Sequence, residues 1–298
     1  MRTLVWFRGK DLRLDDHEPL SHALEQGEVI PLFVLDPYFF APERAQRIAH
    51  RIQFLLDSLS ELAREVERCG SRLLLVEGKS HEVIPDLARR LRVDQVVGQR
   101  WSEPFARRRD ERVKALLHVP FLLFEGETLS PPGTLRSQSG GPFTVFTPFA
   151  RAFAREARVS EPLARPTRLP SLPPDVELPS RPVPTCETLG FARNAAVIHG
   201  GEIAAQARLD SFLAGAGPKY HEQRDRLDLA ATSRLSADLK FGTLSPRRVW
   251  HAVEKALLDA PLALRSLRNE LTWREFTHST LVDFPSVLET PFRPAFRD

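Results

Sequence analysis

Three hydroxyl groups and one guanidinium lie within five consecutive residues in the last third of the chain. The five residues are Thr232, Ser233, Arg234, Leu235 and Ser236. They come just before a helical pattern, and a helix that begins there offers unpaired N–H groups and the positive end of its dipole. Phosphate groups bind at such positions, so these side chains are suited to complete an anion site. The alternative is an ordinary Ser or Thr helix cap beside a solvated arginine.

A second group of candidate functional side chains lies on one predicted helix. Glu270 and Trp273 are three residues apart, so they share a helix face. The indole offers an apolar stacking surface, and the carboxylate accepts hydrogen bonds. A tryptophan alone is equally typical of core packing, so the rest of the chain must decide between the two interpretations.

The elements that must position these groups begin with residues 1–132, where short apolar runs alternate with amphipathic patterns. The apolar runs are 4–7, 30–35, 73–76, 95–97 and 121–124. They are short and bounded by turn residues, as is typical of buried parallel strands. Between positions 48 and 66, apolar residues recur every three or four residues, which predicts a long helix. The alternation predicts an α/β fold with a doubly wound, Rossmann-like parallel sheet.

The tripeptide Gly78-Lys79-Ser80 follows a predicted strand and opens a helix, like the end of a phosphate-binding P-loop. Leu73 occupies the position of the first glycine of that motif, so the motif is incomplete. Ser80 is therefore predicted to be an ordinary helix N-cap.

The composition changes after residue 132. Eight prolines fall between residues 162 and 184, a density that excludes regular helix and favours an extended strap. From residue 200 the apolar period is helical, with helices predicted at 248–258 and 267–276. We therefore expect an α/β domain at 1–132, an interdomain linker at 133–198 and a partial all-α domain at 199–298.

Composition sets only loose limits on function. A net charge of +3 and a pI near 9.1 permit a nucleic-acid partner without requiring one. Cys69 and Cys186 have no metal-ligand neighbours, so neither a disulfide scaffold nor a metal site is expected. No apolar run is long enough to cross a bilayer, and we expect a monomeric cytoplasmic protein without membrane contact.

Several motifs in the second half occur in an order that resembles a known family. They are Tyr220, Arg224, TSRLS at 232–236, KFG at 240–242, LSPR at 244–247 and NELTWREF at 269–276. In this order and spacing they resemble the flavin-binding domain of the DNA photolyase and cryptochrome family, in particular the class I cyclobutane-dimer photolyases. The stretches 6–17 and 140–149 resemble other boxes of the same family, so the resemblance covers nearly the whole chain.

The resemblance implies FAD as the cofactor and DNA containing pyrimidine dimers as the partner. It places Tyr220 and residues 232–236 on the FAD, and Glu270 and Trp273 in the catalytic site against a flipped-out dimer. The implied DNA contacts are Arg224, Glu270, Trp273, Arg274 and Thr277. The implied function is that of a deoxyribodipyrimidine photolyase, which splits dimers by light-driven electron transfer from FAD. The alternative is a cryptochrome-like photoreceptor or a non-catalytic flavoprotein remnant, although retention of both Glu270 and Trp273 favours repair.

The family also binds a second, light-harvesting antenna chromophore in its α/β domain. His17 stands where many members have Asn, which weakens an antenna assignment. Phe105 and Ala106 replace the acidic and amide side chains that hold folate in some relatives, so a deazaflavin or flavin antenna, or none, is expected ahead of folate. The basic residues at 107–114 are predicted to form a solvated helix face.

In the family, further helices after the WREF box complete the flavin pocket, and none follows in this sequence. We therefore expect a fragment, a truncated gene product or a degenerate relative that binds FAD weakly or not at all and does not repair dimers. Residues 1–132 are expected to fold separately.

Overall fold

The computed structural model describes residues 1–259, 262–293 and 295. Its α/β part contains one five-stranded sheet in the order β3-β2-β1-β4-β5, with every neighbouring pair parallel. The strands are β1 (Arg2–Phe7), β2 (Glu28–Leu35), β3 (Leu74–Glu77), β4 (Gln95–Gln99) and β5 (Phe121–Phe124). The predicted doubly wound sheet is confirmed. The strand order reverses between β1 and β4, where sheets of this type form a crevice at the carboxyl ends of the strands.

Period-two alternation along the strands produces two apolar layers. Val5 and Phe7 pack on one face of the sheet with Ile52, whereas Leu4 and Trp6 pack on the other face. The helices of the α/β part are α1 (Glu18–Gln26), α2 (Pro37–Phe40), α3 (Pro42–Arg47), α4 (Ala49–Arg68), α5 (Ser80–Arg90) and α6 (Pro104–Leu116). Helices α1 and α4 cover the first face, and α5 and α6 cover the second.

The predicted N-cap at Ser80 is wrong. Lys79 occupies the cap position of α5, and Ser80 is the first helical residue. Its N–H and hydroxyl both donate to Oδ2 of Asp36, at 2.9 and 2.8 Å. A carboxylate from the end of β2 therefore satisfies the first free N–H of the helix, which the serine side chain does not reach.

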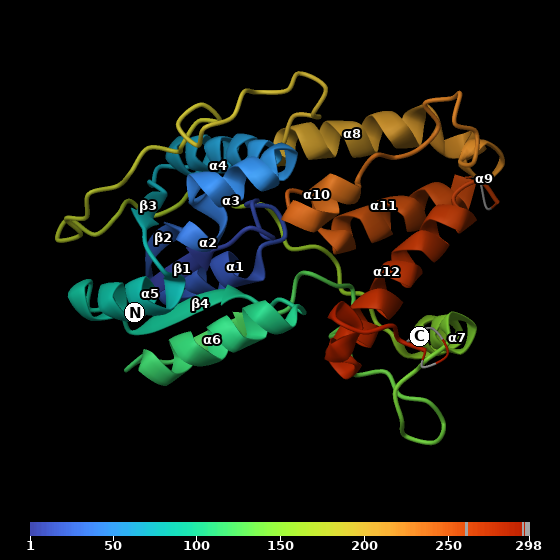
Figure 1. Cartoon of the computed structure of the whole chain (residues 1–298), viewed down its shortest axis with the longest axis horizontal. Coiled ribbons are helices and arrows are strands. Elements are labelled where there is room, and N and C mark those ends of the chain that lie inside the picture. Colours follow the sequence, from blue (N-terminus) through green and yellow to red (C-terminus); the bar gives the residue numbers. More distant parts are fainter. Residues whose placement is uncertain (260–261, 294, 296–298) are drawn as a thin grey trace.

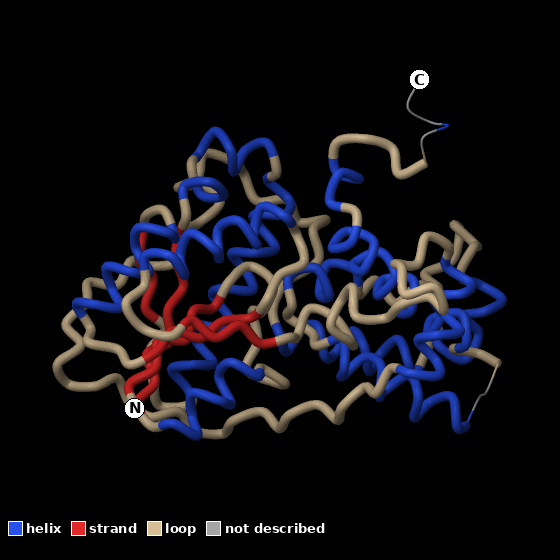
Figure 2. Tube along the Cα trace, turned by 90° about the horizontal axis from the view of Figure 1, so that it is seen from below, coloured by secondary structure: helices blue, strands red, loops and turns tan. Residues whose placement is uncertain are grey.

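The proline-rich strap is confirmed as non-helical between residues 162 and 184, and Figure 2 shows long loop segments beside the strands and helices of the molecule. It is nevertheless packed into the α/β core. Leu169 and Leu189 join one apolar layer, and Leu178 joins the other. At the free edge of β3, Ser180 Oγ accepts from Leu75 N–H at 3.0 Å, so the strap also protects an edge strand.

The remaining helices form a second apolar cluster (Figure 1). They are α7 (Phe146–Glu156), α8 (Glu202–Ala214), α9 (Tyr220–Gln223), α10 (Ser236–Phe241), α11 (Pro246–Asp259) and α12 (Arg265–Asp283), with short 3₁₀ turns at Gly217–Lys219 and Pro285–Leu288. Helix α7 lies inside the predicted linker, yet its Phe149 and Phe153 are buried in this cluster. The three domain ranges stay a prediction, and the last residue of the third, Asp298, lies outside the described residues.

The loop after β1 joins the two parts of the molecule. Arg248 forms an ion pair with Asp15 at 2.6 Å, and Arg247 forms one with Asp16 at 2.8 Å. The buried Arg13 donates to the carbonyl of Gly242 at 3.0 Å. The DLRLDD and LSPRR motifs, nearly 230 residues apart, thus meet in one polar interface.

Candidate functional site

The hydroxyl-rich box at 232–236 lies immediately before α10, as predicted, but none of its side chains caps the helix. Helix α10 begins at Ser236, and the cap position is held by Leu235, whose side chain is buried. The alternative interpretation of the box as an ordinary Ser or Thr cap is therefore wrong. Thr232, Arg234 and Ser236 are exposed, and among the described residues none of the three side chains has a hydrogen-bonding or ionic partner.

The backbone of the box is strained at one position. Arg234 has a φ of 54°, in the left-handed region, which costs a non-glycine residue about 1–2 kcal/mol. Such strain is frequent where a ligand is held. Helix α10 has only six residues, so the guanidinium and hydroxyls, more than the helix dipole, must supply the attraction for an anion.

Arg224 and Glu270 come together although 46 residues separate them. Their side chains form an ion pair at 2.7 Å, with 32% and 45% of each side chain exposed. Tyr220 lies one helical turn before Arg224 and is buried in the same cluster as Leu235. Burial raises the pKa of the Tyr220 phenol. The structure thus joins predicted FAD and DNA residues at one end of α12.

Trp273 lies on the same face of α12 and is 40% exposed. Its indole stacks on Phe146, with 3.7 Å between ring centroids and 9° between the planes. Phe276 contacts it edge-on at 5.7 Å. One face of the indole is therefore fixed by protein, and the side chain is presented to solvent rather than used in the core. The stack with Phe146 was not predicted.

Thr277 and Arg274, two further predicted DNA contacts, differ in exposure. Thr277 is exposed one turn after Trp273, and its hydroxyl donates to the Arg274 carbonyl at 2.8 Å. The Arg274 side chain is only 18% exposed and approaches the buried Glu275 carboxylate at 3.6 Å. Contact between Arg274 and DNA stays a prediction.

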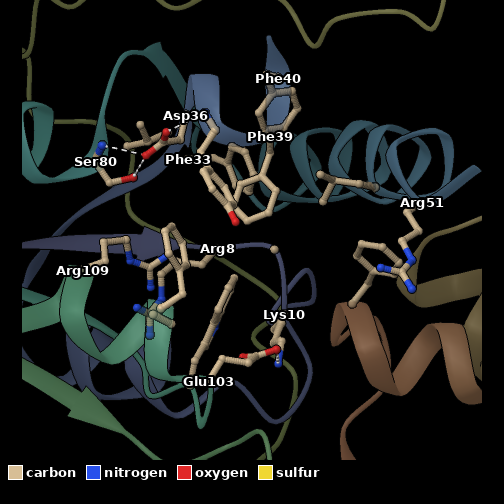
Figure 3. Close-up of a pocket in the computed structure, with 18 of the residues that line it drawn as sticks. Arg8, Lys10, Phe33, Asp36, Phe39, Phe40, Arg51, Ser80, Glu103 and Arg109 are labelled. Carbon is tan, nitrogen blue, oxygen red and sulfur yellow. Dashed lines mark hydrogen bonds and ion pairs between the residues drawn. The ribbon is translucent and has the colours of Figure 1, made fainter. Parts of the chain in front are cut away.

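A separate cavity of about 280 Å³ lies at the carboxyl ends of β1 and β2. Figure 3 shows basic side chains from several elements around it, including Arg8 from the end of the first strand and Arg51 from α4. Lys240 and Phe241 of α10 complete one wall. The two parts of the molecule therefore build this pocket together, and α10 runs from the hydroxyl-rich box to the pocket wall.

The pocket floor is a stack of aromatic rings and guanidinium groups. The Arg8 guanidinium lies 5.0 Å from the Trp6 ring and 5.3 Å from the Trp101 ring. Arg109 lies 4.8 Å from each of these rings. Both arginines bind Asp110, so a single carboxylate is shared by two cations and the group of three side chains keeps one positive charge. Burial, together with the charge of Arg8, lowers the pKa of Arg109 to about 10, which still leaves it protonated at neutral pH.

Positive charge dominates the whole lining. The basic residues are Arg8, Lys10, Arg44, Arg51, Arg109 and Lys240. Among the residues that the structure describes, the carboxylates that line the pocket are those of Asp36 and Glu103, and Figure 3 shows Asp36 already bonded to Ser80. Among the described residues, Arg8 Nε and Nη2 are buried without a hydrogen-bond partner. The pocket therefore fits an anion with a planar aromatic ring.

The predicted antenna-facing stretches are only partly in this pocket. Phe105 and Ala106 line it. His17 does not, because it is fully buried beside Asp11, and its Nδ1 accepts from the Leu20 N–H at 3.1 Å to cap α1. His17 thus caps a helix outside this pocket, and the weakened antenna assignment stays a prediction. The solvated basic face of α6 is confirmed except at Arg109, which points inward.

A buried charged cluster holds α12 against the α/β part. Glu127 pairs with Lys10 and accepts from the Ser102 N–H at 2.7 Å, and Ser102 Oγ lies 3.1 Å from His278. Burial opposes ionisation of Glu127, but Lys10 and His278 lower its pKa to about 2. Burial lowers the pKa of His278 to about 4. Burial also raises the pKa of Glu275, one turn earlier, to about 7.

The chain shares its parallel α/β sheet and the helical layer at the carboxyl edge of that sheet with photolyases of known structure. The crystal structure of a bacterial class III photolyase from Agrobacterium tumefaciens superposes with a TM-score of 0.85 and 32% identity, over 99% of this chain and 62% of that one. The chain belongs to the DNA photolyase family, whose model matches residues 3–171.

Two curated relatives agree with this assignment. A deoxyribodipyrimidine photo-lyase from Synechococcus is 34% identical over 97% of the chain, and one from Thermus thermophilus is 36% identical over 99%. The chain spans 62% and 64% of the lengths of these relatives. The family assigned from sequence is thereby confirmed, while the class I subgroup stays a prediction. In the part of the chain that the structure describes, no helix has both the length and the apolarity needed to cross a membrane.

Proposed function

We propose that the chain carries part of the site for light-dependent repair of cyclobutane pyrimidine dimers, with the phosphates of FAD at the box 232–236 and the lesion at Trp273. The observation that carries the proposal is the convergence of Arg224, Glu270 and Trp273 on one exposed face of the helical part. The three side chains come from two helical regions, and a purely structural role would not require all of them to reach solvent.

The residues present fit the phosphates of FAD. Arg234 and the hydroxyls of Thr232 and Ser236 are exposed and have no partners among the described residues, so an anion displaces no existing contact. When bound and reduced, FAD supplies the electron that is transferred after light absorption. The chain itself supplies the hydrogen bonds and charge that fix the phosphates near α10.

The lesion face is suited to a base that has left the DNA stack. The free face of the Trp273 indole offers a stacking surface, since Phe146 holds only the opposite face. Arg224 orients the Glu270 carboxylate, leaving its second oxygen to accept from a base edge. A dimer is already poorly stacked, so extruding it costs less than extruding a normal base.

The basic pocket between the two parts is the proposed site of a second chromophore. Its excess of cations and the tryptophan rings that contact Arg8 and Arg109 support a flavin or deazaflavin with an anionic group. Phe105 and Ala106 in its wall offer no acceptor for the amino groups of a folate pterin, which supports the same order of preference.

The test is binding of a fluorescent duplex that contains one thymine dimer, compared with the same duplex without it. Base–aromatic stacking contributes about 1–3 kcal/mol, so Trp273→Ala should weaken lesion binding about 5- to 150-fold and leave undamaged DNA unaffected. Leu262→Ala, which removes another exposed apolar side chain of the helical part, is the control. Equal lesion preference in wild type and Trp273→Ala would refute the proposed lesion site.

A further inference from the structure

Two aromatic side chains from opposite walls meet at the mouth of the basic pocket. Tyr38 on α2 and Phe105 on α6 both line the cavity, yet they are 42% and 36% exposed. The floor residues Trp6 and Trp101 are 2% and 7% exposed. The gradient of exposure places Tyr38 and Phe105 at the entrance, between the solvent and the buried rings.

The two entrance rings are in contact. Their centroids are 4.4 Å apart and their planes differ by 19°, which is a stacked geometry. Arg44 covers the Tyr38 ring at 4.5 Å and donates to its hydroxyl at 3.1 Å. Phe39 supports both rings edge-on, at 4.8 and 6.5 Å. The stack is therefore a defined contact across the opening, not two independent surface side chains.

Both entrance residues have the same local setting. Each follows a proline at the first position of a helix, Pro37 in α2 and Pro104 in α6. A proline at this position fixes the start of the helix without losing a hydrogen bond. The backbones on the two sides are thus well defined, so opening the stack requires only that the side chains of the two rings change rotamer.

The cavity is small while the rings are in contact. Its volume of about 280 Å³ lies just below the roughly 300–1,000 Å³ of pockets that enclose drug-sized ligands. A planar tricyclic ligand that enters between α2 and α6 must pass the stacked pair and separate it to reach the floor.

We propose that Tyr38 and Phe105 form a gate that controls entry and exit of the planar anionic ligand of this pocket. The inference rests on the proposed second-chromophore site and adds the route by which that site is filled. An aromatic pair of this geometry reduces the open population about two- to tenfold. Removing either ring should raise both the association rate and the dissociation rate by a similar factor.

Association kinetics separate a gate from an ordinary binding contact. Loss of a contact accelerates dissociation only, because it does not help the ligand to enter. FMN is a suitable probe, since it combines a tricyclic ring with a phosphate and its fluorescence changes on stacking. The parent protein for this experiment is the full chain with Arg234→Ala, which removes the anion site at the box. Stopped-flow mixing with FMN is measured for this parent and for the parent that also carries Tyr38→Ala or Phe105→Ala.

Two further variants define the result. Phe105→Trp retains a stacking ring and should restore the slow association of the parent, whereas Leu116→Ala removes an exposed side chain of the same helix away from the pocket and should change nothing. Association that is unchanged in both alanine variants would overturn the gate.

A measurement without ligand distinguishes failure of the gate from failure of the chromophore site. Acrylamide quenching of tryptophan fluorescence is recorded in a Trp273→Phe background, because Trp273 is 40% exposed and would dominate the signal. Phe105→Ala should increase quenching of the floor tryptophans. If FMN does not bind the parent protein, the proposed chromophore site is contradicted. If quenching is also the same with and without Phe105→Ala, the gate is refuted as well.

Discussion

At Gly242 the backbone of the helical part lies directly against the loop after β1, and Gly242→Ala tests whether this contact holds the two parts together. A Cβ atom there would lie 1.9 Å from the Lys10 carbonyl oxygen and 2.7 Å from the Asp11 nitrogen. Both are backbone atoms, so the loop after β1 must move as a whole. Gly242 also has a φ of 63°, which costs alanine about 1–2 kcal/mol by itself.

Movement of the loop would also break the hydrogen bond from Arg13 to the Gly242 carbonyl. A buried hydrogen bond to a charged group contributes about 1.5–3 kcal/mol, which brings the expected loss for Gly242→Ala to about 3–5 kcal/mol. Gly140→Ala is the matched control, because Gly140 has a φ of 81° but nothing within 4 Å of its Cβ position.

Thermal unfolding followed by circular dichroism measures the difference. Since 1 kcal/mol shifts Tm by about 2–4 °C in large domains, the control should lose about 2–8 °C and Gly242→Ala about 6–20 °C, so that the loss for Gly242→Ala is the larger of the two. Equal Tm values for the two variants would show that backbone strain alone matters and that the interface tolerates the methyl group.

One further substitution and one truncation test the packing. Burial raises the pKa of Glu275 to about 7 from an ordinary 4.5, so its contribution to stability is present below pH 4.5 and lost as pH rises through 7. Glu275→Gln should therefore gain stability relative to wild type between pH 5 and 8, by at most about 3 kcal/mol. A difference in the free energy of unfolding, measured with urea, that does not change with pH would contradict this. Residues 1–132 lack Leu169, Leu178 and Leu189 of the apolar layers, so this segment should unfold at a lower urea concentration than residues 1–198; identical midpoints would show that the strap adds no stability.

The sheet and the long helices could be predicted because their signals are local. Strands such as β1 carry apolar runs, and α4 carries an apolar period that repeats within one segment. The N-terminal contact of α5 could not be predicted, since the side chain that satisfies its first N–H is Asp36, 44 residues earlier. Local propensity favours Ser80 as a cap, and a tertiary contact replaces it.

The candidate site divides in the same way. Glu270 and Trp273 share a face because helical geometry requires it. The stack of Trp273 on Phe146 and the wall that Lys240 adds to the basic pocket join residues more than a hundred positions apart, and no periodicity encodes them. Arg109 belongs to a basic run but points into the pocket, because it binds Asp110 and contacts the pocket tryptophans. The charge pattern of the sequence does not reveal these contacts.

The proposed flavin function depends most directly on the anion site at the box 232–236. Titration of the purified chain with FAD, followed by flavin fluorescence, compares wild type with Arg234→Ala and with Arg226→Ala. Arg226 is a suitable control because it lies in the same loop but is 59% exposed and pairs with Asp228.

Loss of one charge-assisted hydrogen bond costs about 1.5–3 kcal/mol, so Arg234→Ala should raise the Kd for FAD about 10- to 150-fold, while Arg226→Ala binds as wild type does. Equal affinity in wild type and Arg234→Ala, or an equal loss in both variants, would contradict the assignment of the box to FAD.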